Sequence, residues 1–188
     1  MQASPQTSLR ISDLFPVFIQ ERKVLKNVSP KTIIGYQCAY KAFESSLDPL
    51  TVADDLRGAV KAGIDSLHSR LSPISINDYL RCLNAFFNWM QTEGYLKDRL
   101  KIGKLTEPET LPKILPEQEI DKVLLYKPQR MTERTIHLMA LCILDVGPRI
   151  NELLHLRKDQ IDFSQSTLFI ARGKGRKQRQ VPISQPLR

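Results

Sequence analysis

Through its first hundred residues, the chain places apolar residues three or four positions apart, the spacing of an α-helix that buries one face. Four helices are therefore predicted: over residues 11–25, from Ser29-Pro30 to about 43, over 54–71, and from Ser72-Pro73 to about 90. At both Ser-Pro pairs the serine can cap free backbone amides, and the proline suits the first helical position. Short connections between four such helices predict a small bundle in residues 1–100.

The helical pattern breaks at residues 101–112, KIGKLTEPETLP, where two prolines bracket a polar run that is unsuited to a helix. This segment is predicted to be a linker between the helical domain and a second domain over residues 113–188. The second region has helical patterns near 117–126 and 132–145 and then changes period. Short β-like segments, Leu168 to Ile170 and Val181 to Ile183, flank a basic tip, as in a hairpin. The predicted fold class is thus mainly α with a small β-hairpin.

Positive charge gathers in the second half of the chain, which has a formal net charge of +8. Residues 1–100 contain 12 basic and 10 acidic side chains, whereas residues 101–188 contain 16 basic and 10 acidic ones. From Ala171 onward there are six Lys or Arg and no acidic residue. Such a concentrated run is typical of a phosphate-binding surface. A solvated charged loop is the alternative interpretation.

Composition and cysteine usage argue against a disordered, secreted or membrane protein. A content of 41% apolar and 26% charged residues is that of a soluble globular chain. Cys38, Cys82 and Cys142 lie far apart in apolar stretches, which predicts buried thiols of a reducing compartment. The cysteines and histidines have no metal-ligand spacing, and no segment suits a signal peptide or a membrane span. We expect a cytoplasmic protein without a metal and without a membrane partner.

One motif that can carry chemistry is VGPRINELLHL, residues 146–156. Gly147-Pro148 should end one helix and begin another, so Arg149 is expected in the first turn, where free amides favour an anion. Its guanidinium can bind a phosphate through two parallel hydrogen bonds. Glu152, three residues later on the same face, can orient that guanidinium. The alternative is an ordinary surface Arg–Glu pair on an amphipathic helix.

A second motif is the predicted hairpin tip RGKGRKQR, residues 172–179. Two glycines flank Lys174, so the backbone can turn tightly and bring the ammonium close to a substrate. A lysine suits proton donation because burial can shift its pKa. Gln178 stands where a dinucleotide-binding loop needs its last glycine, and no Walker-type sequence is present, so neither nucleotide loop fits.

The order of the two motifs, after a helical domain and a linker, resembles the tyrosine recombinase family, which includes phage integrases and Xer-type resolvases. GPRINELLHL is similar to the family's first-arginine box, and LFIARGKGRKQRQVPI to the strand-turn-strand that carries its active-site lysine. SPKTIIGYQCAYKAFE and SINDYLRCLNAFFNWMQTEGYL resemble its helical core-binding domain. The resemblance implies a four-helix, SAM-like core-binding domain over residues 1–100 and the first part of an α/β catalytic domain over residues 113–188.

The resemblance also implies a reaction, in which a tyrosine attacks the scissile phosphodiester without a metal or a cofactor. It implies that Arg149 is the first catalytic arginine, Glu152 its orienting partner and Lys174 the lysine that protonates the leaving oxygen. Such chemistry depends mainly on positioning and charge stabilisation, which these side chains can supply. Double-stranded DNA and other recombinase protomers are the implied partners, so the protein should be associated with the nucleoid when it is bound to DNA.

The chain departs from the family pattern after Lys174. A His-x-x-Arg box, a second histidine or tryptophan and the tyrosine should follow, but the last fourteen residues contain no His, Trp or Tyr. All five tyrosines precede Arg149 and are interpreted as core or surface aromatics, while His137 and His155 are interpreted as structural. We therefore expect a chain that is truncated within the catalytic domain, exposes apolar surface there and does not cleave DNA alone.

Further candidates for DNA contacts are basic or polar side chains. Those expected on polar faces of the second to fourth helices are Lys31, Arg70, Asn77 and Arg81, and those of the basic tip are Arg172, Arg176, Lys177 and Arg179. Besides a protein of site-specific DNA recombination and integration, two alternatives stay open. One is a non-catalytic regulator that competes with a full-length recombinase for its sites, and the other is a helical adaptor or transcription factor with a basic tail. Whether the chain is an enzyme by itself stays undecided at this stage.

Overall fold

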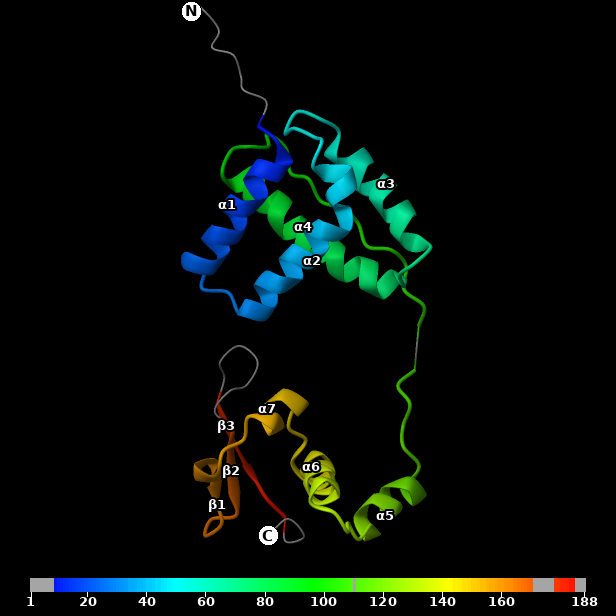
Figure 1. Cartoon of the computed structure of the whole chain (residues 1–188), viewed down its shortest axis with the longest axis vertical. Helices are drawn as coiled ribbons and strands as arrows, with labels where there is room; N and C mark the ends of the chain where they lie inside the picture. Colours follow the sequence, from blue (N-terminus) through cyan, green and yellow to red (C-terminus); the bar gives the residue numbers. More distant parts are fainter. Residues whose placement is uncertain (1–8, 110, 171–177, 185–188) are drawn as a thin grey trace, which may run out of the picture. The chain divides into compact units, whose positions relative to one another are not determined.

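The computed structural model describes residues 9–109, 111–170 and 178–184, and the chain divides into two compact units, residues 1–110 and 111–188 (Figure 1). The first unit is helical, and the second combines helices with a small sheet. The predicted mainly α architecture with a small β element is confirmed. Within the described ranges, no helix has the length and apolar character that crossing a membrane requires.

Four helices build the described part of the first unit, residues 9–109, and all four were predicted. They are α1 (Ile11–Val24), α2 (Pro30–Leu47), α3 (Leu56–His68) and α4 (Pro73–Thr92). Helix α2 packs on the other three, most extensively on α4 and α3, so it lies at the centre of the bundle (Figure 1).

The starts of α2 and α4 follow from local sequence. Ser29 accepts a hydrogen bond from the N–H of Thr32 at 3.2 Å, and Ser72 accepts one from the N–H of Ser75 at 3.4 Å. A proline follows each serine at the start of its helix. Each cap satisfies an amide that the helix leaves unpaired, a contribution of about 1 kcal/mol. The predicted Ser-Pro helix starts are therefore confirmed.

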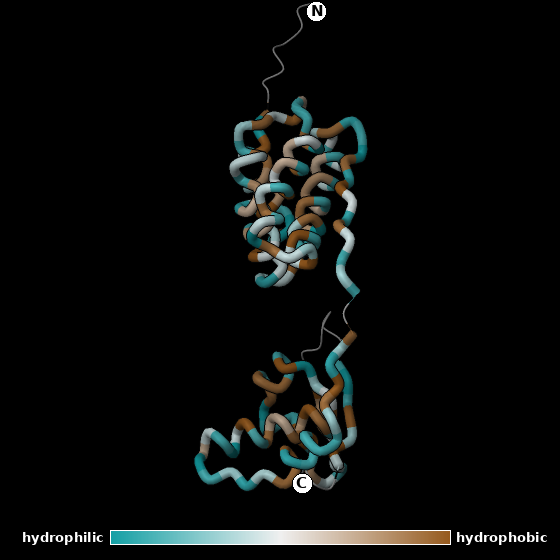
Figure 2. The backbone as a smooth tube through the Cα atoms, turned by 90° about the vertical axis from the view of Figure 1, so that its right-hand side faces the viewer, coloured by the Kyte–Doolittle hydropathy of each residue, from teal (hydrophilic) through white to brown (hydrophobic). Residues whose placement is uncertain are grey.

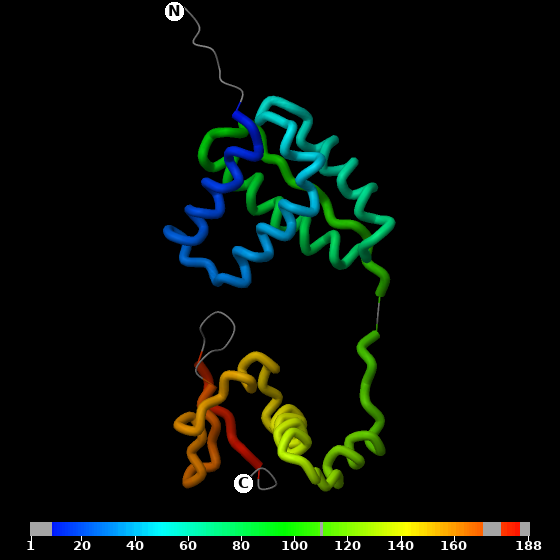
Figure 3. Tube along the Cα trace, in the orientation of Figure 1, coloured from blue at the N-terminus to red at the C-terminus, as the bar shows by residue number. Residues whose placement is uncertain are grey.

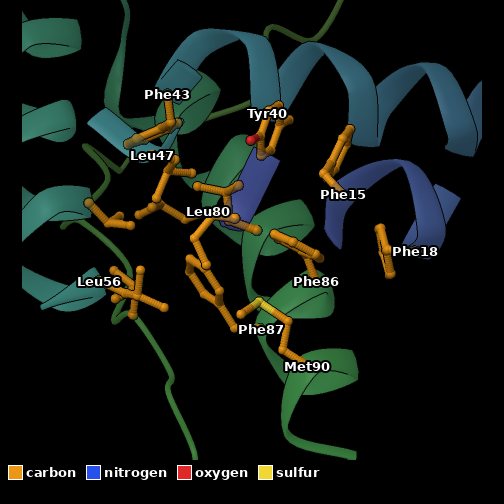
Figure 4. Close-up of a cluster of buried hydrophobic side chains, with 14 of the residues drawn as sticks. Phe15, Phe18, Tyr40, Phe43, Leu47, Leu56, Leu80, Phe86, Phe87 and Met90 are labelled. Carbon is orange, nitrogen blue, oxygen red and sulfur yellow. The ribbon is translucent and has the colours of Figure 1, made fainter. Parts of the chain in front are cut away.

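Aromatic side chains from α1, α2 and α4 fill the centre of the first unit (Figure 4). Phe15 stacks on Tyr40 with ring centroids 3.9 Å apart, and Phe86 meets Phe15 edge-on at 5.3 Å. Such pairs add about 0.5–1.5 kcal/mol to the burial of their surface. Tyr40 is buried and its phenol donates a hydrogen bond to Asp48 at 2.5 Å, so of the two predicted possibilities, core or surface, this tyrosine takes the core. Further members of the core are Phe18, Phe43, Leu47, Leu56, Leu80, Phe87 and Met90.

The segment after α4 runs back along that helix (Figure 3). Asn84 donates to the carbonyl of Ile102 at 3.0 Å and accepts from its N–H at 2.8 Å, and the side chain of Ile102 is buried. Asn77, two helical turns earlier, binds Leu105 in the same way at 3.0 and 2.8 Å. It also donates to Glu107 at 2.7 Å. Residues 102–107 of the predicted linker are thus held on α4.

These contacts correct the prediction that Asn77 lies on a polar face and binds DNA. The residue is only 5% exposed, and both ends of its amide are paired within the unit. A buried amide needs such partners because leaving it unpaired is costly. From the sequence, an asparagine on a helix resembles a solvated residue, since its partners lie 28 residues farther along the chain.

The three cysteines are free thiols. Cys82 and Cys142 are half-buried, and burial raises the pKa of both thiols. The prediction of buried thiols is wrong for Cys38, which is exposed. Cys38 lies on the solvent-facing side of α2, whereas the next residue, Ala39, lies on its buried side.

The described residues of the second unit, 111–170 and 178–184, form three helices, a short 3-10 turn and three strands. Its helices are α5 (Glu117–Leu125), α6 (Met131–Val146) and α7 (Ile150–Leu154), followed by the turn η1 (Lys158–Gln160). The strands β1 (Ile161–Asp162), β2 (Thr167–Ile170) and β3 (Arg179–Pro182) form an antiparallel sheet in that order. The β2–β3 hairpin was predicted, whereas β1 was not, because two residues give no alternation of apolar and polar side chains.

Apolar surface is exposed in the second unit, as predicted. No residue of α5 or α6 is buried, and the structure describes every residue of both helices. A groove of about 300 Å³ lies between α6, α7 and the sheet. Figure 2, which colours the backbone by hydropathy, shows several hydrophobic segments along this unit. The most exposed large side chains include Leu111, Ile114, Leu125, Met131, Ile136, Leu154 and Phe163.

Candidate active site

The candidate site begins where α6 ends. Gly147 adopts the left-handed conformation, φ 60° and ψ 39°, and its N–H bonds to the carbonyl of Ile143 at 3.1 Å. A residue with a side chain is strained there, and glycine is not. Pro148 follows, and its missing N–H removes a helical hydrogen bond. Arg149 is extended, with φ −69° and ψ 146°, and α7 begins at the next residue. Arg149 is therefore the N-cap of α7 rather than a member of its first turn, which corrects the predicted placement.

Glu152 holds Arg149 in two ways. Its Oε2 accepts the backbone N–H of Arg149 at 2.9 Å, and its Oε1 accepts from Nη1 of the Arg149 guanidinium at 2.8 Å. The contact predicted between these two side chains is present. However, the amide of Arg149 is occupied by the carboxylate, so it is not available to an anion. The guanidinium is the part of Arg149 that can meet a phosphate, and its side chain is 58% exposed.

A second arginine reaches the same carboxylate from β3. Nη1 of Arg179 donates to Oε1 of Glu152 at 3.1 Å, and Nη2 donates to Oε2 at 2.8 Å. This is the two-pronged geometry in which arginine binds carboxylates most strongly. Sequence reasoning counted Arg179 among the DNA contacts, but the structure pairs its guanidinium with Glu152. The alternation of inward and outward side chains along the predicted hairpin could have indicated an inward-facing Arg179, since this residue pairs with buried Ile170.

Burial and charge set the electrostatics of these three residues, which we call the Glu152 cluster (Arg149, Glu152 and Arg179). The side chain of Glu152 is 3% exposed, against 36% for that of Arg179. The hydrogen bonds from the Arg179 side chain, followed by that from the Arg149 backbone, lower the pKa of Glu152 to about 2. The carboxylate is therefore ionised at neutral pH, and the cluster carries two positive charges and one negative charge. Its net +1 charge and the exposed Arg149 suit an anionic ligand.

The other predicted site residues fall into two groups. Lys174, the predicted catalytic lysine, lies outside the described residues, as do Arg172, Arg176 and Lys177. In the first unit, Lys31, Arg70 and Arg81 are exposed, and Arg81 pairs with Asp78 at 3.2 Å. Their contacts with DNA stay predictions.

Histidines and acidic residues add no metal site in the ranges that the structure describes, where no group of three or more metal-binding side chains gathers. His137 bonds through Nε2 to the carbonyl of Val123 at 2.7 Å. His155 bonds through Nδ1 to the carbonyl of Asn151 at 2.9 Å. The His137 ring thus links α6 to α5, which agrees with its interpretation as a structural residue, whereas the exposed His155 bonds to the carbonyl of its own helix.

Comparisons with known proteins give a consistent family. Residues 111–188 match the model of the phage integrase family. Tyrosine recombinase XerA of Pyrococcus furiosus is 32% identical over 87% of this chain and 54% of the relative, and XerC of Oceanobacillus iheyensis is 30% identical over 88% and 56%. The chain thus spans about half the length of the curated relatives that it matches.

Solved structures share the fold. The Tn1549 transposon integrase in complex with circular intermediate DNA matches with a TM-score of 0.73 and 20% identity, over 96% of this chain and 62% of that one. A lambda integrase dimer bound to a COC′ core site matches with a TM-score of 0.73 and 15% identity, over 96% and 53%. At these identities the likeness concerns the fold of the chain.

Proposed function

The chain belongs to the tyrosine recombinase family, and we propose that it binds double-stranded DNA in site-specific recombination and integration, with Arg149 on a backbone phosphate. The observation that carries this proposal is the exposed guanidinium of Arg149, held by a buried carboxylate in a cluster of net positive charge. A guanidinium has five N–H donors, and Glu152 takes only one of those of Arg149. The remaining donors suit the non-bridging oxygens of a phosphodiester.

In the reaction of the family, charge builds on those oxygens as the phosphoryl group is transferred. A guanidinium fixed in advance stabilises that charge without reorganising at the moment of reaction. This is the role that we assign to Arg149, with Glu152 as its orienting partner. Lys174 is assigned the protonation of the leaving oxygen, a role that rests on its place in the sequence motif.

The 188 residues are proposed to bind DNA without cutting it by themselves. All five tyrosines precede Arg149 in the sequence. Tyr40 is buried and bonded to Asp48, and Tyr126 bonds to Glu133 at 3.2 Å. Neither is placed by these contacts on the Glu152 cluster. The proposal therefore assigns the role of nucleophile to none of these five tyrosines.

Other recombinase protomers are the proposed protein partners, and the protein is proposed to act in the cytoplasm on nucleoid DNA. Related folds have been solved as a lambda integrase dimer and tetramer on DNA. The apolar surface of the second unit gives this chain an area that a partner can cover. The free thiols agree with a reducing compartment.

The test is a binding titration with a fluorescent DNA duplex at several salt concentrations. The affinity of the wild-type chain should fall steeply with salt, and R149Q should lower the slope of log affinity against log salt by about 0.9, the value of one phosphate contact. K122Q is the matched control, because Lys122 pairs with Glu119 on α5 and its loss changes the net charge equally. A salt-independent affinity, or equal slopes for R149Q and wild type, would contradict the proposal.

A suicide duplex that traps covalent protein–DNA product tests the second part. The wild-type chain alone should give no trapped product. Trapped product that disappears when one tyrosine is changed to phenylalanine would show that the chain carries its own nucleophile.

A further inference from the structure

We propose that Arg179 is a positioning residue, which fixes Arg149 through their shared carboxylate Glu152 and joins it to the end of the β2–β3 hairpin. The inference rests on the proposed function of Arg149 and adds a residue to that site. Arg179 is not assigned a contact with DNA.

The hydrogen bonds around Glu152 fix the position of the carboxylate. Oε1 accepts from Nη1 of both arginines, and Oε2 accepts from Nη2 of Arg179 and from the backbone N–H of Arg149. Two carboxylate oxygens offer about four acceptor sites. All four are occupied, two by Arg149 and two by Arg179, which follows Glu152 by 27 residues in the sequence. Glu152 lies on a helix of only five residues. Without Arg179, its carboxylate would be bonded only to Arg149 at the start of that same helix, and nothing from the sheet would fix its position.

The charges explain why a second arginine is needed. Glu152 with Arg149 alone is a neutral pair, and a neutral pair attracts a phosphate weakly. Arg179 compensates the carboxylate and leaves one net positive charge. Of the two arginine side chains, that of Arg149 is the more exposed, at 58% against 36%. A ligand would therefore meet the net positive charge of the cluster mainly at the guanidinium of Arg149.

The position of Arg179 in the sheet connects two motifs of the site. Arg179 pairs with Ile170 in the last register position of β2 and β3 before residues 171–177. Lys174 belongs to that segment and precedes Arg179 by only five residues in the sequence. One buried carboxylate thus holds both the proposed phosphate-binding arginine and the strand that follows the proposed proton donor.

The experiment compares salt slopes of DNA binding for R149Q, R179Q and the double variant R149Q/R179Q in the full chain. If Arg179 acts through Glu152, each single variant and the double variant lose the same slope, about 0.9, because only one phosphate contact exists. If Arg179 binds a phosphate itself, the double variant loses about 1.8, and the inference is overturned. An unchanged slope in R179Q overturns it as well.

A conservative variant separates the effect of the positive charge of Arg179 from that of its two hydrogen bonds to Glu152. R179K keeps the positive charge beside Glu152, so it should keep the wild-type slope although its single ammonium cannot bind both oxygens. K122Q again serves as the charge control. A slope in R179K that is as low as in R179Q would mean that charge compensation is not what Arg179 supplies.

A titration without DNA distinguishes failure of this inference from failure of the proposed function. Carbon-13 NMR should show the pKa of the Glu152 carboxyl near 2 in the wild-type chain and higher in R179Q, with a shifted guanidinium signal of Arg149. If the wild-type chain shows no affinity for DNA, the proposed function fails, and the titration still decides the link. Unchanged Glu152 and Arg149 signals in a folded R179Q chain would refute it.

Discussion

Asn77 binds Leu105 through both ends of its side-chain amide, donating to the carbonyl at 3.0 Å and accepting from the N–H at 2.8 Å. This is the pattern of a β-ladder, in which an amide of the backbone has been replaced by that of a side chain. Asn84 holds Ile102 in the same way. The two asparagines fix an extended segment to α4, so the boundary of the first unit lies beyond the end of its last helix.

Replacing Asn77 with alanine should destabilise the first unit without acting on DNA directly. The change leaves the carbonyl and N–H of Leu105 without their partner, a loss of about 1–3 kcal/mol in the free energy of unfolding. Urea denaturation measures it. N88A is the matched control, because Asn88 is exposed on the same helix and its loss should change stability little. If N77A is as stable as N88A, the amide does not hold the segment in solution.

The Glu152 cluster should make the second unit sensitive to acid. The pKa of Glu152 is lowered from 4.5 to about 2 in the folded chain. Its contribution to stability is therefore complete above pH 4.5 and is lost as the pH falls toward 2. E152Q should lower the free energy of unfolding by about 1.5–3 kcal/mol at neutral pH and flatten the acid limb of the stability curve.

Thermal unfolding from neutral pH down to about 2 measures this dependence. D159N is the control, because Asp159 forms an exposed pair with Arg157 and should leave the acid limb unchanged. An acid limb of E152Q as steep as that of the wild type would show that other groups cause it.

Tyr40 should make the first unit sensitive to alkali. Burial, and then the hydrogen bond to Asp48, raise the pKa of Tyr40 above its ordinary value of 10.0. The stability that its neutral phenol contributes is complete below pH 10 and is lost as the pH rises above it. Y40F cannot ionise, so it should lose about 0.5–1.5 kcal/mol at neutral pH but show a shallower alkaline decline. Circular dichroism at increasing pH measures this decline, with Y79F as the comparison. An alkaline decline of Y40F as steep as that of the wild type would contradict the prediction.

Two helical glycines should respond in opposite directions to alanine. A Cβ at Gly63 would lie 2.5 Å from Cδ1 of Phe43, so G63A should destabilise the first unit by about 1–3 kcal/mol. A Cβ at Gly35 would meet only Sγ of Cys82, at 3.9 Å, an ordinary contact. G35A should therefore stabilise α2 by about 0.5–1 kcal/mol, since glycine disfavours a helix interior. Equal effects of the two changes in urea denaturation would contradict this packing.

Much of the fold was predictable because its signals are local. The Ser-Pro pairs fixed the starts of α2 and α4 through caps that span three residues. The hairpin of β2 and β3 could be recognised from two short apolar runs around a basic tip. Glu152 was paired with Arg149 for the same reason, since residues three apart lie on one side of a helical turn.

By itself, the sequence determined the helices, the hairpin and the pairing of Arg149 with Glu152, because propensity, capping and spacing act within a few residues. Only the tertiary structure decided which partners the distant polar groups take. The packing of the first unit brings Asn77 to Leu105, and the sheet of the second unit brings Arg179 to Glu152. A polar side chain can face water or a buried partner, and the choice depends on packing that brings remote segments together.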